Sequence, residues 1–256
     1  ITGLACPSED VGYVVDVEKD DNQWVKVSED GCVRVVSNET LQWTDTDHCG
    51  LDEYAGWCWL DNVSQDEYAG HMFGLGAIAR LVDDPGVRNT AAGLIESVGN
   101  HLMVNDLTFV DWDGRATEHG KMYPSSWADP PGYLALLSMN YVLMAAVVSG
   151  RQDLMDYYDL CLLQKGAEPL ECLPWPLEKP IPFTDYTSML MHFIGPEGCE
   201  SNFNNHAMLH SGMFSLIWFE REPQIRELVQ GVFDEGVMRA DNPKAGLNQL
   251  NSWYNF

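Results

Sequence analysis

The sequence predicts a mainly α-helical protein that carries a small β-rich segment at its N-terminus. Three observations indicate this fold. Short β-prone stretches fill the first 60 residues, helical spacing of apolar residues begins near Ser64, and long loops rich in Pro and Gly separate the predicted helices into pairs. We therefore expect two domains, a β-rich appendage over 1–60 and a helical domain over 61–256.

We expect the appendage to be a small β-hairpin or β-meander. Three short stretches rich in Val, at 12–16, 24–27 and 32–36, show the alternation of a half-buried strand. Asp, Asn and Gly residues lie between them, and these residues favour tight turns.

The cysteines predict that disulfides staple this appendage. Four of the seven cysteines lie in the first 58 residues and three lie near 161–199, with no CxxC pair among them. This spacing is typical of disulfides formed in an oxidising compartment and not of a zinc cluster. We expect pairing mostly within each cluster, with one thiol left over. The cysteines are Cys6, Cys32, Cys49, Cys58, Cys161, Cys172 and Cys199.

The helical part is predicted as three pairs of helices. Ser64 and Glu67 match a capping box at the start of the first helix, and Asp84-Pro85 ends that helix and starts its partner. Two further pairs are expected, at 133–148 with 153–164 and at 205–220 with 222–238, and the long connections at 109–126 and 166–187 are expected to be loops. Paired helices with long loops are typical of an α/α toroid or a helical-hairpin array. A full toroid of six pairs needs a longer chain, so we expect a partial array, or a chain that continues past Phe256.

One short sequence occurs twice. The five residues Asp-Glu-Tyr-Ala-Gly stand at 52–56 and again at 66–70. The second copy opens the first predicted helix. Trp57-Cys-Trp59 between the copies favours chance or local duplication over a solenoid repeat.

The charge of the chain restricts its partners. There are 39 acidic residues against 14 Lys and Arg, which gives a formal net charge of −25. Such a surface repels phosphate backbones, so we expect no nucleic-acid partner, and a neutral substrate or a divalent cation such as calcium fits better. The alternative is that the acidity only keeps an extracellular protein in solution.

The sequence also predicts export. No apolar run approaches the roughly 20 residues of a membrane-spanning helix. A chain that begins at Ile1 and carries this cysteine pattern reads as already processed, so an extracellular or periplasmic location is expected. Asn38 and Asn62 stand in sequons that would allow N-glycosylation.

Three polar segments are candidates for chemistry, and the first is Ser64–His71. On a helix, Glu67 and His71 are four residues apart and share one face. A carboxylate beside an imidazole serves as an acid–base pair or as two metal ligands. The alternative is a capped helix start with a hydrogen-bonded histidine.

The second segment spans residues 110–119. Asp111, Asp113 and Glu118 lie in a glycine-containing loop and offer oxygen ligands to a hard cation, although the spacing is not that of an EF-hand. Trp112 between the two aspartates offers a flat ring on which a sugar would stack. The alternative is a polar turn closed by Asp-Gly.

The third segment is Asn202–His206, which continues to His210. His206 and His210 are again four residues apart, a spacing used by paired metal ligands. Asn205 next to His206 also matches the amide and imidazole that some polysaccharide lyases use around a uronate. The alternative is an N-cap followed by a packed histidine.

These segments carry a resemblance to known proteins. The motifs at 64–71, 111–120, 129–133 and 204–208 resemble those of a group of uncharacterised exported bacterial proteins, over about residues 58–256. The architecture of that group is similar to that of α/α-toroid carbohydrate-active enzymes. The resemblance therefore implies a helical toroid and activity on a glycan, whereas the few Lys and Arg residues depart from the pattern of uronate-specific lyases.

Taken together, the motifs predict a secreted glycan-active enzyme, of hydrolase or lyase type, with a cleft between interhelical loops. The expected catalytic residues are Glu67, Asp111, Asp113 and His206. The expected sugar-binding residues are Trp112, Tyr123, Trp127 and Asn205, and the candidate metal ligands are His71, Glu118 and His210. The alternative is a non-catalytic extracellular structural, filament or surface subunit that self-associates and is stabilised by disulfides and calcium.

Overall fold

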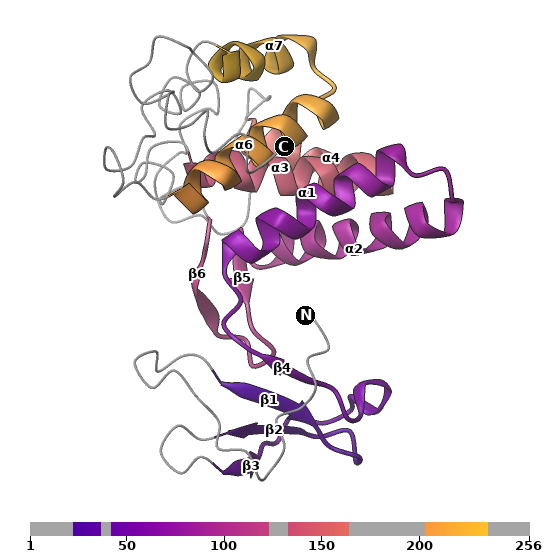
Figure 1. Cartoon of the computed structure of the whole chain (residues 1–256), viewed down its shortest axis with the longest axis vertical. Helices are drawn as coiled ribbons and strands as arrows, with labels where there is room; N and C mark the ends of the chain where they lie inside the picture. Colours follow the sequence, from indigo (N-terminus) through magenta and orange to yellow (C-terminus); the bar gives the residue numbers. More distant parts are fainter. Residues whose placement is uncertain (1–22, 37–41, 123–132, 164–202, 235–256) are drawn as a thin grey trace. The chain divides into compact units, whose positions relative to one another are not determined.

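A computed structural model describes residues 23–36, 42–122, 133–163 and 203–234 of the chain (Figure 1). It divides the chain into two compact units. The first comprises Ile1–Ser64 and Phe109–Gly120, and the second comprises Gln65–Thr108 and Lys121–Phe256. The segment 109–120 thus belongs to the first unit, although it follows two helices of the second unit in the sequence.

The first unit contains a four-stranded antiparallel sheet, which confirms the predicted N-terminal β-structure. Its strands are β1 (Trp24–Val27), β2 (Val33–Val36), β3 (Trp43–Asp45) and β4 (Cys58–Leu60), in the order β3-β2-β1-β4. β1 lies in the centre because it pairs with both β2 and β4. Burial alternates along β1, whereas on β2 the first and last residues are buried. The buried side chains are Val25, Val27, Val33, Val36 and Cys58.

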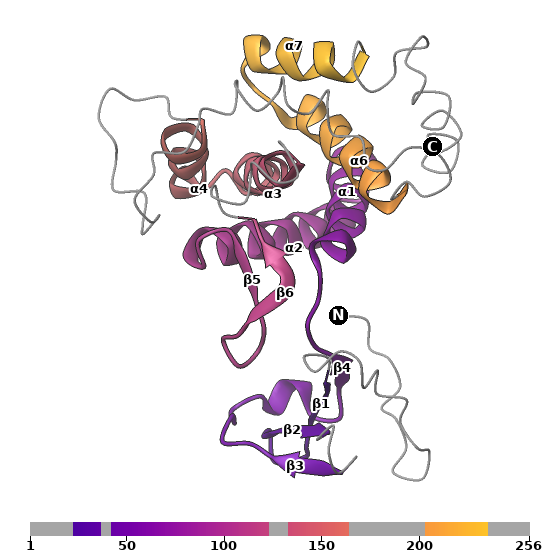
Figure 2. The same cartoon turned by 90° about the vertical axis from the view of Figure 1, so that its left-hand side faces the viewer.

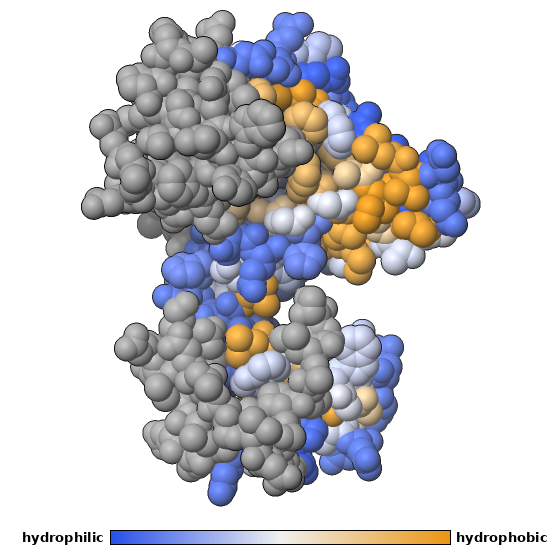
Figure 3. All heavy atoms as spheres, in the orientation of Figure 1, coloured by the Kyte–Doolittle hydropathy of each residue, from blue (hydrophilic) through white to orange (hydrophobic). Residues whose placement is uncertain are grey.

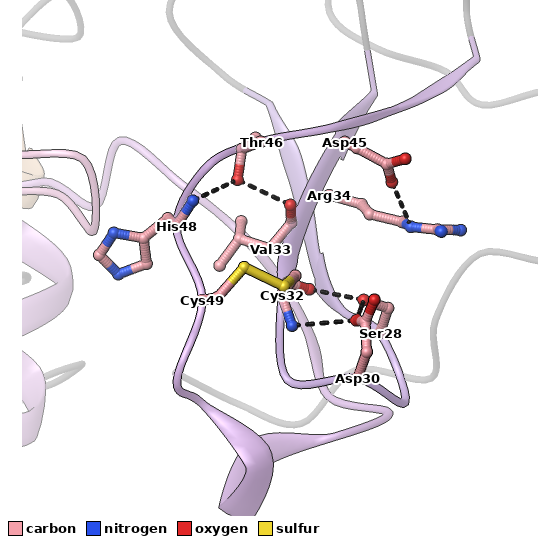
Figure 4. The surroundings of a disulfide bond; sticks show 9 residues. All are labelled: Ser28, Asp30, Cys32, Val33, Arg34, Asp45, Thr46, His48 and Cys49. Carbon is pink, nitrogen blue, oxygen red and sulfur yellow. Dashed lines mark hydrogen bonds and ion pairs between the residues drawn. A yellow bond between two sulfur atoms is a disulfide. The ribbon is translucent and has the colours of Figure 1, made fainter.

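A disulfide bond between Cys32 and Cys49 closes the turn region of this sheet (Figure 4). The loop between β1 and β2 turns at Gly31, whose φ of +74° is favourable for glycine. Asp30 caps this turn by accepting a hydrogen bond of 3.1 Å from the Cys32 amide. The bond confirms pairing within the N-terminal cysteine cluster for these two residues. Cys58 is also disulfide-bonded, and so is Cys161 in the second unit.

Residues 109–126 were expected to be a loop, and the structure shows that this expectation is wrong for their first part. β5 (Thr108–Val110) and β6 (Ala116–Lys121) form a two-stranded hairpin. Asp-Gly at 113–114 makes the turn, with Gly114 at a φ of +82°. Gly120 packs against Phe109 so closely that a Cβ at this position would lie 2.9 Å from the Phe109 carbonyl oxygen.

The second unit is helical, as predicted. α1 (Gln65–Leu81) and α2 (Pro85–Val104) form a helical hairpin, and the Asp84 carboxylate accepts hydrogen bonds from the first amides of α2. α3 (Tyr133–Ser149), α4 (Gln152–Asp156) and the π-helical turn η3 (Tyr157–Leu162) follow. α6 (Phe203–Phe219) and α7 (Pro223–Val232) form the last pair, with Pro223 in the first turn of α7.

α3 is the central helix of this unit. It packs against α2, α6, α4 and η3, and Figure 2 shows it almost end-on with α2 and α6 beside it. All of its described side chains between Leu134 and Ala146 are buried, which explains why its sequence is apolar on every face. None of the helices that the structure describes is both long and apolar enough to cross a membrane.

The α1–α2 hairpin exposes apolar side chains. Leu81, Val87 and Leu94 are all more than two-fifths exposed, and hydrophobic atoms gather over α1 and α2 in Figure 3. Asp83 and Asp84 at the tip of the hairpin are exposed as well.

Gly99 on α2 packs directly against Ala145 on α3. A Cβ at residue 99 would lie 2.1 Å from the Cβ of Ala145, which is attached directly to the backbone and cannot move aside. We expect Gly99→Ala to lower the free energy of unfolding by about 2 kcal/mol, although alanine is the better helix former. Urea unfolding followed by circular dichroism measures this loss.

Two further variants control for helix propensity. Gly93 lies in the same helix with nothing within 4 Å of a Cβ, so Gly93→Ala should stabilise the protein by about 0.5–1 kcal/mol. The double variant Gly99→Ala/Ala145→Gly should recover part of the loss, because it removes the clashing methyl group. If Gly99→Ala and Gly93→Ala were equally stable, the close approach of α2 and α3 would be contradicted.

Candidate active site

The three predicted polar segments lie in two different units. Glu67 and His71 are on α1 and His210 is on α6, in the second unit, whereas the segment 111–118 belongs to the first unit. Tyr123 and Trp127 lie outside the described residues, as do the side chains of Asn205 and His206 on α6. The proposed meeting of the three segments in one cleft therefore stays a prediction.

The candidate metal ligands are in different environments. His71 is exposed, and its Nδ1 lies 2.7 Å from the backbone carbonyl of Glu67, one turn earlier on α1. His210 is completely buried on α6, with its ring 6.1 Å from the ring of Phe233. Glu118 is exposed on β6, and its carboxylate lies 3.7 Å from the His119 ring. Within the described ranges, no group of three or more His, Cys, Asp or Glu side chains is arranged to hold a metal ion.

The hairpin tip between β5 and β6 concentrates charged groups in the first unit. The Asp111 amide donates to the carbonyl of Arg115 over 2.8 Å, and the Gly114 amide donates to the carbonyl of Asp111 over 2.9 Å. This pattern is a three-residue hairpin loop with glycine in the left-handed region. The turn places Asp111, Asp113 and Arg115 close together in space.

A third carboxylate, that of Asp61, joins this cluster from the segment after β4. Its side chain has an exposed fraction of 0% and forms an ion pair of 3.1 Å with the Arg115 guanidinium. Its other oxygen accepts a hydrogen bond of 2.5 Å from the Gln23 amide. The same guanidinium forms an ion pair with Asp113, so that Arg115 bridges a buried and an accessible carboxylate.

Asn62 fixes the hairpin tip to the segment after β4. Its backbone amide donates to the Asp111 carboxylate over 2.8 Å, and its side-chain oxygen accepts from the Glu118 amide over 2.7 Å. The residue has a φ of +62°, a conformation that asparagine tolerates better than most residues. The backbone at Asn62 thus positions the Asp111 carboxylate directly.

The cluster separates the pKa values of its carboxyl groups. The pKa of Asp61 is raised to about 6, mainly by burial and also by the negative charge of Asp111, while the Gln23 amide and Arg115 oppose the rise. Burial also raises the pKa of Asp111, although the Asn62 amide opposes this shift. Burial also tends to raise the pKa of Asp113. The hydrogen bonds and the positive charge of Arg115 outweigh this effect, so that the pKa of Asp113 is lowered.

Trp112 lies between the two hairpin aspartates and is half-buried. Its indole Nε1 is buried and makes no hydrogen bond of standard geometry. The indole N–H nevertheless lowers the pKa of the Asp61 carboxyl. The ring meets the exposed His48 edge-to-face at 5.6 Å. Trp112 is therefore held next to the carboxylates, as a sugar-binding ring would need to be.

A second buried carboxylate, Glu220, has a structural role in the helical unit. One of its oxygens accepts a hydrogen bond from the Tyr158 hydroxyl, and the other accepts from the Glu222 amide over 2.8 Å. Arg226 donates to its backbone carbonyl. Glu220 thereby anchors the start of α7, and burial raises the pKa of its partner Tyr158.

The structure thus groups Asp111, Trp112 and Asp113 in one site, and it adds Asp61, Asn62 and Arg115, which the sequence did not indicate as members of a catalytic or binding site. Comparison with protein-family models finds no match to this chain, and searches of curated proteins and of solved structures find none either.

Proposed function

We propose that this protein is a secreted glycan hydrolase whose acid–base pair lies at the hairpin tip of the first unit. The observation that carries the proposal is the opposite shift of two neighbouring carboxyl groups. The pKa of Asp111 is raised and that of Asp113 is lowered, within a single turn. Pairs of carboxyl groups whose pKa values are pushed apart are what glycoside hydrolysis needs.

Each carboxyl group has a defined role in this proposal. Asp111 stays protonated to higher pH and donates a proton to the glycosidic oxygen as the bond breaks. Asp113 is exposed and ionised, and it serves as the second carboxylate of the pair. Arg115 keeps Asp113 ionised through its ion pair and hydrogen bonds.

The substrate class follows from the charge and the aromatic residue at the site. Asp61, Asp111 and Asp113 surround a single arginine, and the whole chain has a net charge of −25. A polyanionic glycan would be repelled, so the substrate is a neutral polysaccharide. Trp112 offers an apolar ring for the face of a sugar. A uronate lyase would instead need Asn205 and His206, whose side chains lie outside the described part of the chain.

The architecture and the location belong to the same proposal. The helical hairpins α1–α2 and α6–α7 and the central α3 are compatible with part of an α/α toroid. The Cys32–Cys49 disulfide favours an oxidising, extracellular or periplasmic compartment.

Incubation with neutral polysaccharides tests the proposal. Mixed-linkage β-glucan, xylan and galactomannan are digested over a range of pH, and new reducing ends are measured together with ultraviolet absorption. We expect reducing ends without the absorption of an unsaturated product. Absorption near that of a double bond conjugated to a carboxylate would instead assign a lyase, and a lack of any product would remove the enzyme proposal.

A second candidate is favoured by one specific observation. The hydrogen bonds that join Asn62 to Asp111 and Glu118, and Asp61 to Gln23, all lie within the unit and brace it internally. A non-catalytic extracellular structural or surface subunit would use the cluster in this way. It predicts no glycan cleavage and self-association, which size-exclusion chromatography with light scattering detects.

A further inference from the structure

A pair of exposed aromatic rings lies in the turn before β4. Tyr54 and Trp57 are 47% and 48% exposed, although the sheet beside them has an apolar core. The rings meet edge-to-face with their centroids 6.5 Å apart. Leaving two such rings half in water forgoes about 1 kcal/mol of burial each, so the arrangement calls for an explanation.

The backbone that carries these rings is rigidly held. The amide of Gly56 donates to the carbonyl of Val27 over 2.8 Å, and the amide of Val27 donates to the carbonyl of Trp57 over 3.0 Å. Within the turn, the Trp57 amide donates to the carbonyl of Tyr54 over 2.9 Å, and Gly56 adopts a φ of +83°. Because the turn is tied to the inner strand β1, the backbone positions from which the two rings project are fixed before any ligand binds.

The size of the exposed surface points to a small ligand. Aromatic side chains bury about 150–250 Å² each, so two half-exposed rings offer on the order of 200 Å². A stable protein–protein interface buries about 800 Å² on each partner, which is several times more. One or two sugar rings match the smaller area.

The polar neighbours also suit a sugar. Asp52 and Glu53 directly precede Tyr54 and are both exposed in the first turn of the short helix η1 (Asp52–Tyr54). Their carboxylates accept hydrogen bonds from hydroxyl groups, and they repel an anionic ligand. Apolar ring faces together with nearby hydrogen-bond acceptors suit a neutral, hydroxyl-rich ligand.

We infer that Tyr54 and Trp57 form a binding platform for a neutral oligosaccharide, at a site separate from the acid–base pair. The choice of ligand class rests on the proposed function, whereas the platform itself rests on the exposure and the rigidity of the turn. The platform would hold one part of a polysaccharide while another part of the same polysaccharide is cleaved.

Affinity electrophoresis tests the platform without any need for turnover. The full chain is run in native gels that contain mixed-linkage β-glucan, xylan or galactomannan, at low temperature. We expect at least one polysaccharide to retard the protein. Trp57→Ala should weaken this binding about tenfold and Tyr54→Ala several-fold, since loss of one stacking ring removes roughly one factor of ten.

The controls separate the platform from folding and from catalysis. Leu60→Ala removes another exposed apolar side chain of the same unit and should leave binding unchanged, and Trp57→Phe should bind within about threefold of the wild type because it keeps a ring. Retardation by a glycan in a protein that cleaves none would support the platform and remove the hydrolase.

Three outcomes would overturn the inference. The first is unchanged binding by Trp57→Ala, the second is no retardation by any of the three polysaccharides, and the third is binding by Trp57→Phe that is as weak as that of Trp57→Ala.

Discussion

Replacing Asp111 by asparagine is expected to reduce glycan hydrolysis by about 10²–10⁴-fold, the range that removal of a general acid usually costs. The amide oxygen of asparagine can still accept the hydrogen bond that the Asn62 amide makes with Asp111. The hairpin tip should therefore keep its geometry while losing its proton donor. Initial rates of reducing-end formation, measured at saturating and at low polysaccharide concentration, give kcat and kcat/KM for this comparison.

The pH profile gives this prediction a second readout. The wild type should lose activity on the alkaline side as Asp111 ionises, and on the acidic side as Asp113 becomes protonated. Asp113→Asn should remove the acidic limb, and Asp111→Asn the alkaline limb.

A matched control is available in the same unit. Asp45 is exposed and forms an ion pair with Arg34 on the sheet, so Asp45→Asn changes the charge by the same amount without touching the hairpin tip. We expect it to keep wild-type kcat. If Asp111→Asn and Asp45→Asn were equally active, Asp111 would not be the acid.

The helices could be predicted from sequence because their signals are local. Asp84 caps α2 and Pro85 occupies its first turn, as their order in the sequence indicates. α3 could be recognised by its long apolar run, and its burial on all sides is the reason for that run. Such signals need no knowledge of what the segment packs against.

The repeated pentapeptide shows the limit of local signals. Residues 52–54 form the short 3-10 helix η1, followed by a turn in which Gly56 has a positive φ, whereas the identical residues 66–70 lie in α1. The first copy is followed by β4, which pairs with β1, and the second is followed by residues that continue the helix. Five residues are too few to nucleate a helix by themselves, so the flanking sequence and the tertiary contacts decide.

The candidate site was predictable only in part for the same reason. Asp111, Trp112 and Asp113 form a compact polar motif, so they could be found by reading along the chain. Asp61 lies about fifty positions earlier and is joined to them through Arg115. No pattern of spacing indicates that pairing, and the hairpin itself was missed because β6 (Ala116–Lys121) has no apolar alternation.

The buried Asp61 carboxyl should make the first unit more stable at pH 4 than at pH 7. Its pKa is about 6 in the folded protein and 3.8 as the reference value, so the folded state binds more protons between these values. Stability therefore falls as the pH rises through this window. A difference of about two pKa units corresponds to about 3 kcal/mol, and because the side chain is completely buried, solvent screening does not reduce it.

Asp61→Asn isolates this contribution from that of the many other acidic groups. Asparagine can still accept the hydrogen bond from the Gln23 amide, but it does not titrate, so the difference in stability between wild type and variant should change by about 2.5 kcal/mol from pH 4 to pH 7. Hydrogen exchange at the amides of Asn62 and Glu118, which are bonded within the cluster, reports opening of this site directly. The exposed Asp45→Asn serves as the charge-matched control. Parallel curves for wild type and Asp61→Asn would mean that Asp61 is not held in the protonated form, and the electrostatic basis of the proposed acid–base pair would then be lost, since the same burial raises the pKa of Asp111.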